Sequence, residues 1–464
     1  MKLRRWQSNC LTGALNWFKT QSHFMCLATP GSGKTRLSAE LAKSLLQANK
    51  IDFVLTFAPS IEVAQNTSNT FTKVLGRRFD GQIGAIGGAY TYQSLLFIQA
   101  DFWQIFDSHR VLVVLDEVHH CAGSDLSNSN SWGEQVLLRI QSKATFSIAL
   151  SGTPWRSDDL PIVLAKYTDP EGKVRCDYEY GLAEAIKDGV CRNPKLVLID
   201  HDRILLTNLR SGIQSFESFA ELLSSNGITY DQLIQNPQAV HFMLNRGCQK
   251  LKEIRLKNPN AAGLVVARSV EHAHVIAAEL SNTFAQSVKV VTYRDHDASK
   301  TIDAFRYSNE QWIVSVGMIS EGTDIPRLQV CCHLSIVKTE MHFRQVLGRI
   351  LRMTNDVDKD GWMFVFAEPT LVEFANDLHH EIPESRVVQF DSYRPRVAAE
   401  QRIGRTFDAS TKLDDYSEIR CNNDLHLTLQ PEIFDSEPVR YSRTRLEWAG
   451  QFREQIIATF NSSF

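Results

Sequence analysis

Residues 28–35 read Ala-Thr-Pro-Gly-Ser-Gly-Lys-Thr and decide the fold of the first part of the chain. The stretch follows an apolar run at 23–28 and opens a segment in which Leu37, Leu41 and Leu45 recur every fourth residue, as on one face of a helix. A glycine-rich turn between a strand and a helix directs backbone N–H groups and the positive helix end toward an anion. The sequence therefore predicts a phosphate-binding loop; the alternative is a turn that serves packing alone.

Each position of this loop has an expected role. We expect Gly31, Ser32 and Gly33 to cradle phosphate with their backbone, and Lys34 to reach the β- and γ-phosphates of a nucleotide. The Thr35 hydroxyl is the expected Mg2+ ligand. The usual pattern begins with Gly, and here that position is Ala28.

A second acidic element follows the apolar run Val-Leu-Val-Val-Leu at 111–115. Asp116 and Glu117 come at the carboxyl end of this predicted strand, where open α/β sheets bind ligands. We expect Asp116 to hold Mg2+ and Glu117 to polarise the attacking water. His119 and His120 are interpreted as strand residues pointing to opposite sides, which argues against a shared metal.

Apolar runs alternate with helical patterns over most of the chain. Such alternation predicts α/β domains with parallel sheets. The pattern weakens over 160–235, and restarts with a helical stretch at 238–257. The predicted organisation is a domain at 1–160, a connector at 161–234, a second domain at 235–385 and a C-terminal extension at 386–464. Trp448, Phe452 and Ile456 recur at four-residue spacing in the extension; they are expected to pack on the second domain or, alternatively, to dock a protein partner.

Composition limits the class of protein. The 464 residues contain 50 Lys plus Arg and 53 Asp plus Glu, which excludes a uniformly basic nucleic-acid coat. The nine cysteines are scattered without a CxxC pair, as expected of reduced thiols. The first residues lack the apolar run of a signal peptide, and no stretch of about 18 apolar residues predicts a membrane span. We therefore expect a soluble, cytoplasmic protein.

Four further motifs, in order, carry a family resemblance. They are Asp116-Glu117-Val118-His119, Ser151-Gly152-Thr153-Pro154, Glu321-Gly322-Thr323-Asp324-Ile325-Pro326 and Gln345-Val346-Leu347-Gly348-Arg349-Ile350-Leu351-Arg352. With the phosphate loop, they resemble the motifs of superfamily 2 helicases of the DExH type over nearly all of residues 1–385. The resemblance implies two tandem RecA-like P-loop domains with parallel sheets, followed by a short C-terminal extension, and implies ATP and Mg2+ as cofactors.

The last of these motifs has its own physical reading. Gln345, Arg349 and Arg352 stand at offsets 0, 4 and 7, which places them on one face of a helix. Two guanidinium groups on one face suit an anion, and an arginine supplied across a domain interface neutralises charge developing on a γ-phosphate. A solvated basic stripe is the alternative. The resemblance implies that Gln345 positions water and that Arg349 and Arg352 are arginine fingers.

The resemblance also implies binding roles elsewhere. Residues 3–7, Leu-Arg-Arg-Trp-Gln, are similar to an adenine-reading segment, with Gln7 facing the base and Trp6 in place of the usual Tyr. Gly322 and Asp324 are implied nucleotide contacts, Asp324 on the sugar, and Ser151 and Thr153 couple the ATP site to nucleic acid. The implied nucleic-acid contacts are Pro59, Ser60, Thr91, Gln93, Arg268 and Thr323. The alternative for these small polar residues is helix capping.

The predicted function is an ATP-dependent helicase or translocase that moves along or unwinds DNA. Three alternatives stay open: an RNA helicase, a nucleic-acid-stimulated ATPase subunit of a restriction, repair or phage-defence complex that does not unwind on its own, and a P-loop kinase of small molecules. The kinase needs no second α/β domain with arginine fingers, so the motif at 345–352 argues against it.

Overall fold

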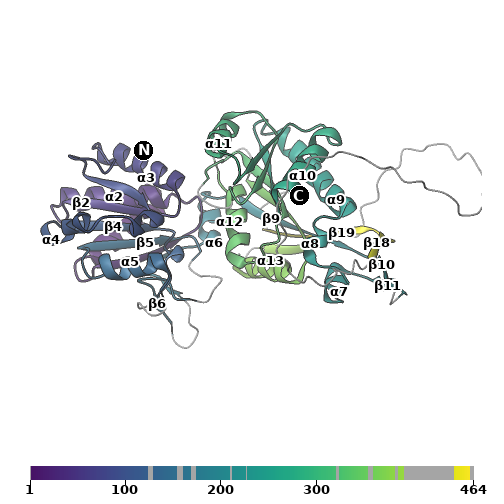
Figure 1. The fold of residues 1–464 in the computed structure, drawn as a ribbon, viewed down its shortest axis with the longest axis horizontal. Coiled ribbons are helices and arrows are strands. Elements are labelled where there is room, and N and C mark those ends of the chain that lie inside the picture. Colours follow the sequence, from purple (N-terminus) through teal and green to yellow (C-terminus); the bar gives the residue numbers. More distant parts are fainter. Residues whose placement is uncertain are drawn as a thin grey trace, which may run out of the picture.

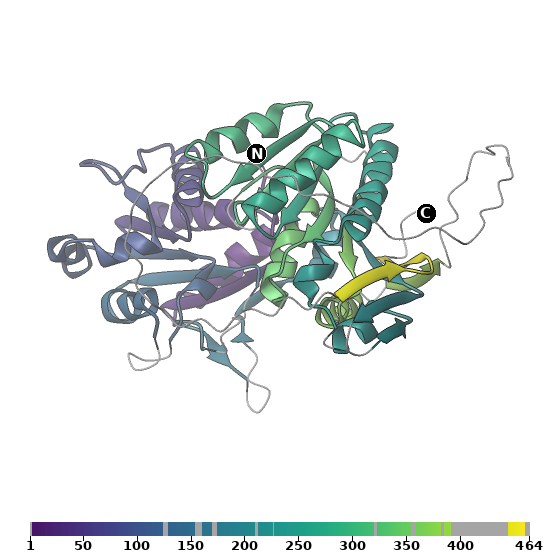
Figure 2. The same ribbon diagram turned by 45° about the vertical axis from the view of Figure 1, so that its right-hand side comes forward.

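The computed structural model describes residues 2–123, 129–153, 160–168, 174–208, 212–225, 227–319, 323–353, 359–381, 385–390 and 444–459. Two lobes, each built on a sheet flanked by helices, lie side by side along the long axis of the molecule (Figure 1). Turning the molecule by 45° keeps the first lobe, drawn in purple to blue, beside the teal-to-green second lobe (Figure 2).

The first lobe is built on a six-stranded parallel sheet. Its strand order is β3-β2-β4-β5-β1-β8. The strands are β1 (His23–Ala28), β2 (Phe53–Ala58), β3 (Gly87–Thr91), β4 (Val111–Asp116), β5 (Phe146–Ser151) and β8 (Tyr178–Tyr180). The helices are α1 (Arg5–Trp17), α2 (Lys34–Gln47), α3 (Ile61–Leu75), α4 (Ile105–Ser108), α5 (Ser131–Arg139) and α6 (Leu182–Lys187), with short 3-10 helices η1 (Tyr92–Leu96), η2 (Ala100–Gln104) and η3 (Val118–His120).

Burial in β4 explains why its sequence is apolar throughout. Leu112 and Val114 belong to one hydrophobic cluster, whereas Val113 and Leu115 belong to another on the opposite face of the sheet. Successive side chains of a strand point to opposite faces, so a sheet covered on both faces needs apolar residues at every position. The larger cluster continues through Tyr180 and Cys191 into the second lobe, so the two domains share one apolar core at the hinge.

The second lobe is built on an eight-stranded sheet of order β13-β14-β12-β15-β16-β9-β19-β17, in which β19 runs antiparallel to both of its neighbours, β9 and β17. The strands are β9 (Asn193–His201), β12 (Ala262–Ala267), β13 (Val288–Thr292), β14 (Trp312–Val316), β15 (Leu328–Leu334), β16 (Asp360–Phe366), β17 (Ser385–Phe390) and β19 (Phe452–Thr459). The helices are α7 (Phe219–Ser224), α8 (Tyr230–Leu233), α9 (Pro237–Arg255), α10 (Val270–Asn282), α11 (Ala298–Tyr307), α12 (Glu340–Ile350) and α13 (Pro369–Glu381). Both lobes are therefore RecA-like α/β domains, as the motifs predict.

Two small sheets complete the described fold. Strands β11 (Gly212–Phe216), β10 (Ile204–Asn208) and β18 (Thr444–Trp448) form an antiparallel sheet at the far end of the second lobe (Figure 1). Strands β6 (Lys166–Tyr167) and β7 (Val174–Arg175) form a hairpin on the first lobe. The described segments contain no helix long and apolar enough to span a membrane. The eight cysteines in the described segments form no disulfide bonds.

The connector and the extension both contribute to the sheets. The segment 161–234 supplies β8 to the first sheet and β9 to the second, and the C-terminal segment supplies β18 and β19. The four-residue spacing of Trp448, Phe452 and Ile456 lies on strands, not on a helix. Phe452 stacks on Phe242 of α9, with ring centroids 4.3 Å apart, and Ile456 is buried. These side chains therefore pack on their own second domain.

Candidate functional site

The phosphate loop joins β1 to α2 through two left-handed glycines. Gly31 has φ +80° and Gly33, the residue before α2, has φ +95°, a backbone region that side chains with a Cβ rarely enter. Ser32 is fully buried, and its hydroxyl has no hydrogen-bond partner among the described residues. Thr35 lies in the first turn of α2. The loop therefore has the glycine-dependent geometry that a phosphate cradle requires.

Lys34 and Glu117 form the centre of the first-domain site. The Lys34 ammonium lies 3.1 Å from a Glu117 carboxylate oxygen and donates to the Ala28 carbonyl at 3.1 Å. Burial raises the pKa of Glu117, but the charges of Lys34 and His119 and a hydrogen bond from the Gly152 amide together outweigh it and lower this pKa to about 2. Glu117 is therefore ionised, and its basicity depends on where Lys34 lies.

The segment after β5 connects this centre to the rest of the domain. The Gly152 amide donates to Glu117 Oε2 at 3.2 Å, and Ser151 Oγ lies 3.0 Å from Nδ1 of His119. The Thr153 amide donates to Ser151 Oγ at 3.1 Å. A movement of residues 151–153 therefore changes the surroundings of the Glu117 carboxylate directly. Pro154 lies outside the described residues.

The two adjacent histidines do not lie on a strand, which corrects the expectation from the sequence. They belong to the 3-10 helix η3, because the chain turns at Glu117, which has φ +49°. The rings of His119 and His120 lie 4.5 Å apart between centroids, tilted by 34°. The two rings therefore lie close together, and the prediction that they point to opposite sides is wrong. Within the described residues, no group of three or more His, Cys, Asp or Glu side chains is arranged to hold a metal.

The N-terminal segment binds to the phosphate loop itself. Gln7 Nε2 donates to the Gly33 carbonyl at 2.9 Å, and the Arg4 guanidinium donates to the Ser32 carbonyl at 2.7 Å. Gln7 Oε1 also accepts from the Arg4 amide at the start of α1. Trp6 is 3% exposed and stacks on Tyr180 at 4.7 Å, so its ring serves the core.

The second domain brings its arginines to the same place. Gln345 and Arg349 lie on α12, whereas Arg352 lies two residues beyond the end of this helix. Arg349 and Arg352 each donate to the Thr323 carbonyl, at 2.8 and 2.5 Å, and Arg352 also donates to Asp324 Oδ1 at 2.6 Å. Gly322 lies outside the described residues. In this conformation both arginines are held by the segment 323–324 of their own domain.

A cleft of about 670 Å3 lies between the domains and is lined by both sets of groups. This volume is within the range of roughly 300–1,000 Å3 typical of small-molecule sites. From the sites predicted in the sequence, its walls include Gly31, Gly33, Lys34, Thr35, Pro59, Asp116, Glu117, Thr153, Asp324, Gln345, Arg349 and Arg352. Thus residues more than three hundred positions apart in the sequence meet around one cavity.

The cleft suits a magnesium nucleotide. The ammonium of Lys34 and the left-handed glycines provide cationic and N–H groups for phosphate, while the buried Ser32 hydroxyl has no partner in the part of the chain that the structure describes. The Thr35 side chain and the Asp116 carboxylate face the same cleft and are oxygen donors of the kind that Mg2+ prefers. The residues present therefore fit ATP and Mg2+.

The residues predicted to contact nucleic acid have diverse surroundings. Ser60 and Thr91 accept hydrogen bonds from Val63 and Ser94 and so cap α3 and η1. Arg268 pairs with Asp231 at 2.7 Å. Gln93 is exposed, whereas Thr323 is 1% exposed. Capping does not use up a hydroxyl, but only Gln93 of these five has a freely exposed side chain.

Several cleft residues had no role in the sequence reading. Arg4 and Arg306 line the cleft, together with the polar face of α3 formed by Asn66, Thr67, Asn69 and Thr70. Arg306 of the second domain also reaches Glu62 of the first at 3.9 Å. Arg4 belongs to the quoted N-terminal motif, so its basic charge was a usable signal. Arg306 and the α3 face belong to no motif, and only the fold brings them to the cleft.

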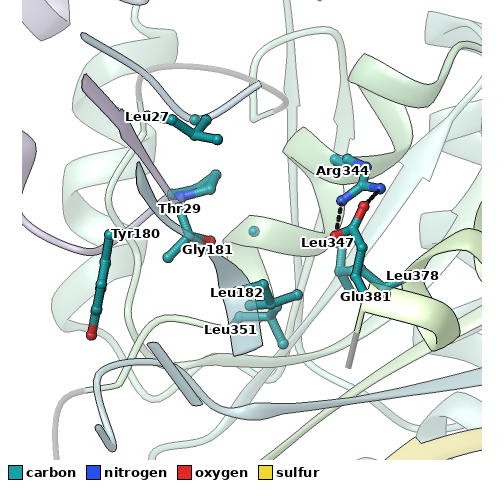
Figure 3. A pocket seen from close by; sticks show the side chains of 13 residues that line it. Leu27, Thr29, Tyr180, Gly181, Leu182, Arg344, Leu347, Leu351, Leu378 and Glu381 are labelled. Atoms are coloured by element: carbon teal, nitrogen blue, oxygen red, sulfur yellow. Dashed lines mark hydrogen bonds and ion pairs between the residues drawn. The ribbon is translucent and has the colours of Figure 1, made fainter. Parts of the chain in front are cut away.

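A second, smaller cavity of about 160 Å3 is lined by residues of both domains (Figure 3). Leu27 and Thr29 of the first domain, with Tyr180 and Leu182, surround it together with Leu347, Leu351 and Leu378 of the second domain. Arg344 and Glu381 point toward each other at its rim and form a bidentate pair (Figure 3). Pro30 borders both cavities and therefore separates the large cleft from this apolar hinge pocket.

Comparison with known families assigns both domains. Residues 1–156 match the family described as "Type III restriction enzyme, res subunit", and residues 247–354 match the "Helicase conserved C-terminal domain". These matches cover the phosphate loop, the acidic motif and the arginine helix. The chain is a superfamily 2 helicase-family protein. Domains of this superfamily use ATP, generally with Mg2+.

Curated relatives share the two-domain region. An uncharacterized protein of Mycobacterium tuberculosis is 29% identical over 392 residues, which are 81% of this chain and 63% of the relative. A protein named DNA 3'-5' translocase XPB2 from Sulfurisphaera tokodaii is 24% identical over 383 residues, 76% of this chain and 79% of the relative. The chain thus spans about 63% of the length of the mycobacterial relative.

Solved structures share the fold at low sequence identity. A fragment of a putative HsdR subunit of a type I restriction enzyme from Vibrio vulnificus has a TM-score of 0.54 and 16% identity, covering 80% of this chain and 65% of that one. The Type ISP restriction-modification enzyme LlaBIII, solved bound to DNA, has a TM-score of 0.52 and 16% identity, covering 79% of this chain and 28% of that one. Both likenesses concern the tandem RecA-like architecture.

Proposed function

We propose that this chain is an ATP-driven motor that translocates along DNA. The single observation that carries the proposal is the interdomain cleft, in which Lys34, Asp116 and Glu117 face Gln345, Arg349 and Arg352. A small-molecule kinase does not need arginines from a second RecA-like domain, whereas a motor does, because such arginines make hydrolysis depend on domain closure.

The side chains suggest how the site works. The Lys34 ammonium, now paired with Glu117, is the cation that reaches the β/γ-phosphates, and its departure removes the charge that depresses the Glu117 pKa. Glu117 then becomes a better base for the attacking water. Mg2+, held by Thr35 and Asp116, would neutralise phosphate charge. Gln345 orients the water, and Arg349 and Arg352 stabilise the growing γ-phosphate charge.

Hydrolysis is transmitted to nucleic acid through residues 151–153 and the strand ends of both domains. Gly152 and Ser151 contact Glu117 and His119, so a change at the ATP site moves this segment. Pro59, Ser60, Thr91, Gln93, Arg268 and Thr323 are the proposed contacts to one strand, with Thr323 requiring a local rearrangement because it is buried here. Such contacts position a backbone without reading its sequence.

Translocation without strand separation is the form we favour. The named translocase relative and the restriction-enzyme neighbours support this choice, and the C-terminal aromatic residues are already packed on the second domain. Unwinding, action on RNA and service as a subunit of a larger complex are the alternatives. We further propose a cytoplasmic location, in line with the reduced cysteines.

The test is ATPase activity without nucleic acid and with single-stranded DNA, duplex DNA and RNA, beside two movement assays. We expect duplex DNA to stimulate turnover most, and expect displacement of a triplex-forming strand without separation of the duplex. Strand displacement would favour a helicase, and stimulation by RNA alone would favour an RNA enzyme. Hydrolysis that no nucleic acid stimulates would refute the motor.

A further inference from the structure

Arg192 lies where the chain crosses from the first domain to the second. The chain leaves the first sheet after β8, passes through α6, and enters the second sheet at β9, whose first residue is Asn193. Arg192 is only 2% exposed. Burying a guanidinium group is costly unless its N–H groups are satisfied, so its partners define its purpose.

The partners of Arg192 lie in two parts of the second domain, the end of α12 and the segment that begins at Thr323. Nη1 donates to the carbonyls of Leu328, at 2.9 Å, and Ile350, at 3.0 Å. Nη2 donates to the carbonyl of Pro326 at 3.0 Å. Ile350 is the last residue of α12, and Pro326 lies two residues after the segment 323–324 that holds Arg349 and Arg352. One side chain therefore joins both segments.

The Arg192 guanidinium lies at the C-terminal end of α12, where a positive charge is electrostatically favourable. The last carbonyls of a helix lack partners within the helix and carry the negative end of its dipole. A buried guanidinium at Ile350 satisfies one of these carbonyls, and the Arg192 amide satisfies the next by donating to Leu351 at 2.7 Å. The end of α12, from which Arg349 and Arg352 project, is therefore fixed to the interdomain crossing.

The preceding residue extends the contact to the phosphate loop. Cys191 forms a β-bridge with Arg352, and its thiol lies 3.7 Å from the Pro30 carbonyl. Residues 191 and 192 thus touch the phosphate loop of the first domain and both motifs of the second. No other step of the proposed mechanism uses this dipeptide.

We propose that Arg192 is a positioning residue for the two arginine fingers. It fixes the end of α12 against the segment 323–328 at the domain crossing, so that closure of the cleft delivers Arg349 and Arg352 in a defined orientation. The inference rests on the proposed ATPase function. It deepens that function by naming a residue outside all recognised motifs on which the geometry of the fingers depends.

Arg327 provides a matched control. It is also buried in the second domain, at 8% exposure, and it also donates to three carbonyls, those of Asn260, Phe305 and Glu310. Arg327 lies within the segment 323–328 itself, but none of its acceptors belongs to α12, so it does not join this segment to the helix that carries Arg349. Arg192→Met and Arg327→Met therefore each remove a buried guanidinium that donates to three carbonyls, but only Arg192→Met removes a contact to α12.

The experiment compares these variants in ATPase assays. Arg192→Met should lower kcat about tenfold or more while KM for ATP changes much less, because misplacing a group that acts in the transition state costs turnover. Arg192→Lys should rescue poorly, since an ammonium cannot span three carbonyls as the planar fork does. Combined with Arg352→Ala, Arg192→Met should cost little more, because both changes affect one function. The losses of kcat caused by Arg327→Met and by Arg352→Ala should instead multiply when the two changes are combined.

Hydrogen exchange without nucleotide gives a readout independent of hydrolysis. Amides of 346–353 should exchange faster in Arg192→Met than in wild type and should be unchanged in Arg327→Met. Equal losses of turnover in the two Met variants, additivity with Arg352→Ala, or unchanged exchange at 346–353 would overturn the inference. If Arg192→Met does not fold, Arg192→Lys carries the same measurements. A wild-type chain without ATPase activity would refute the proposed function, while the exchange comparison would still test the positioning role.

Discussion

The two domains hold their catalytic groups in different ways. In the first domain the groups contact one another: Lys34 pairs with Glu117, Glu117 accepts from Gly152, and His119 contacts Ser151. In the second domain Arg349 and Arg352 turn to the Thr323 carbonyl and to Asp324. The first set is assembled around the position of phosphate, and the second is held by partners within its own domain.

This difference indicates which contacts must be exchanged during each cycle of ATP hydrolysis. The first-domain set needs only the transfer of Lys34 from a carboxylate to a phosphate, two anions in the same cleft. The second-domain arginines must exchange a carbonyl and a carboxylate for the phosphate. Because that exchange requires domain movement, we expect loss of the phosphate-binding Lys34 to affect ATP binding and chemistry together, and substitutions of the second-domain arginines to affect chemistry alone.

Lys34→Ala should have the largest effect. Without the ammonium, β/γ-phosphate charge is uncompensated, and turnover should fall about a thousand-fold. ATP affinity should fall as well, because Lys34 also binds the ground state. Steady-state ATPase rates and nucleotide titration measure the two effects. A variant with more than about a tenth of wild-type turnover would count heavily against the phosphate loop, given such charge effects.

Arg349→Ala and Arg352→Ala test the other half of the comparison. Each should lower turnover by up to about a thousand-fold with little change in ATP affinity, since a finger acts on charge that grows in the transition state. The two losses should not multiply, because the groups serve one transition state. Arg→Lys changes should not rescue, because an ammonium lacks the planar fork. Near-normal DNA-stimulated hydrolysis in the double variant would leave the first domain as a lone ATPase.

Glu117→Gln should separate binding from chemistry inside the first domain. The amide keeps the shape of the carboxylate but cannot accept the proton of water, so turnover should fall by about a hundred-fold or more. ATP should still bind, and DNA should be held tightly in an ATP-dependent closed state. A folded variant that fails to bind ATP in an equilibrium titration would show that Glu117 has a structural role.

The sequence predicted most of the strands that carry the site. The apolar runs at 23–28 and 111–115 coincide with β1 and with all but the last residue of β4, because a parallel sheet covered on both faces leaves uninterrupted apolar segments. The strands it missed, β8, β9 and β19, pair with partners far away in the chain, and no local pattern records such pairing. The glycine-rich β3, which forms an edge of its sheet, was missed for want of an apolar run.

The site residues likewise fall into those that the sequence could predict and those that it could not. Lys34, Glu117, Arg349 and Arg352 were predictable because the chemistry of phosphate needs these residue types in recognisable motifs. The bonds of Arg349 and Arg352 to the Thr323 carbonyl, and the role of Arg192 at the crossing, were not predictable, because every residue has a backbone carbonyl and the sequence does not show which one accepts a bond. The prediction that His119 and His120 diverge failed for a related reason: the turn at Glu117 is a backbone feature.

Gly348→Ala tests the contact between α12 of the second domain and the phosphate loop of the first, and its effect on turnover should be smaller. A Cβ at this position would lie 2.8 Å from Pro30 Cβ, so it would push α12 away from the phosphate loop. Turnover should fall about tenfold, as expected of a displacement of the fingers by a fraction of an ångström, with ATP affinity nearly kept. Gly13→Ala, in open space on α1, is the control and should leave kinetics unchanged. Equal kinetics in the two variants would contradict close packing of the domains during catalysis.

The smallest effect concerns acid stability, in which the domains should again differ. In the second domain, burial lowers the pKa of His333 to about 3, and burial lowers that of His342 to about 4. Below their ordinary value of 6.5 the unfolded chain gains protons that the folded domain does not, so stability that is complete above pH 6.5 is lost as the pH falls toward 4. Each histidine contributes a slope of about 1.4 kcal/mol per pH unit.

Hydrogen exchange at pH 7 and pH 5, corrected for the intrinsic pH dependence of exchange, should show protection lost first in the second domain. His342→Gln should reduce this loss, whereas His274→Gln, at an exposed site on α10, should not; an identical pH dependence in both variants would show that the buried pair does not set the acid sensitivity.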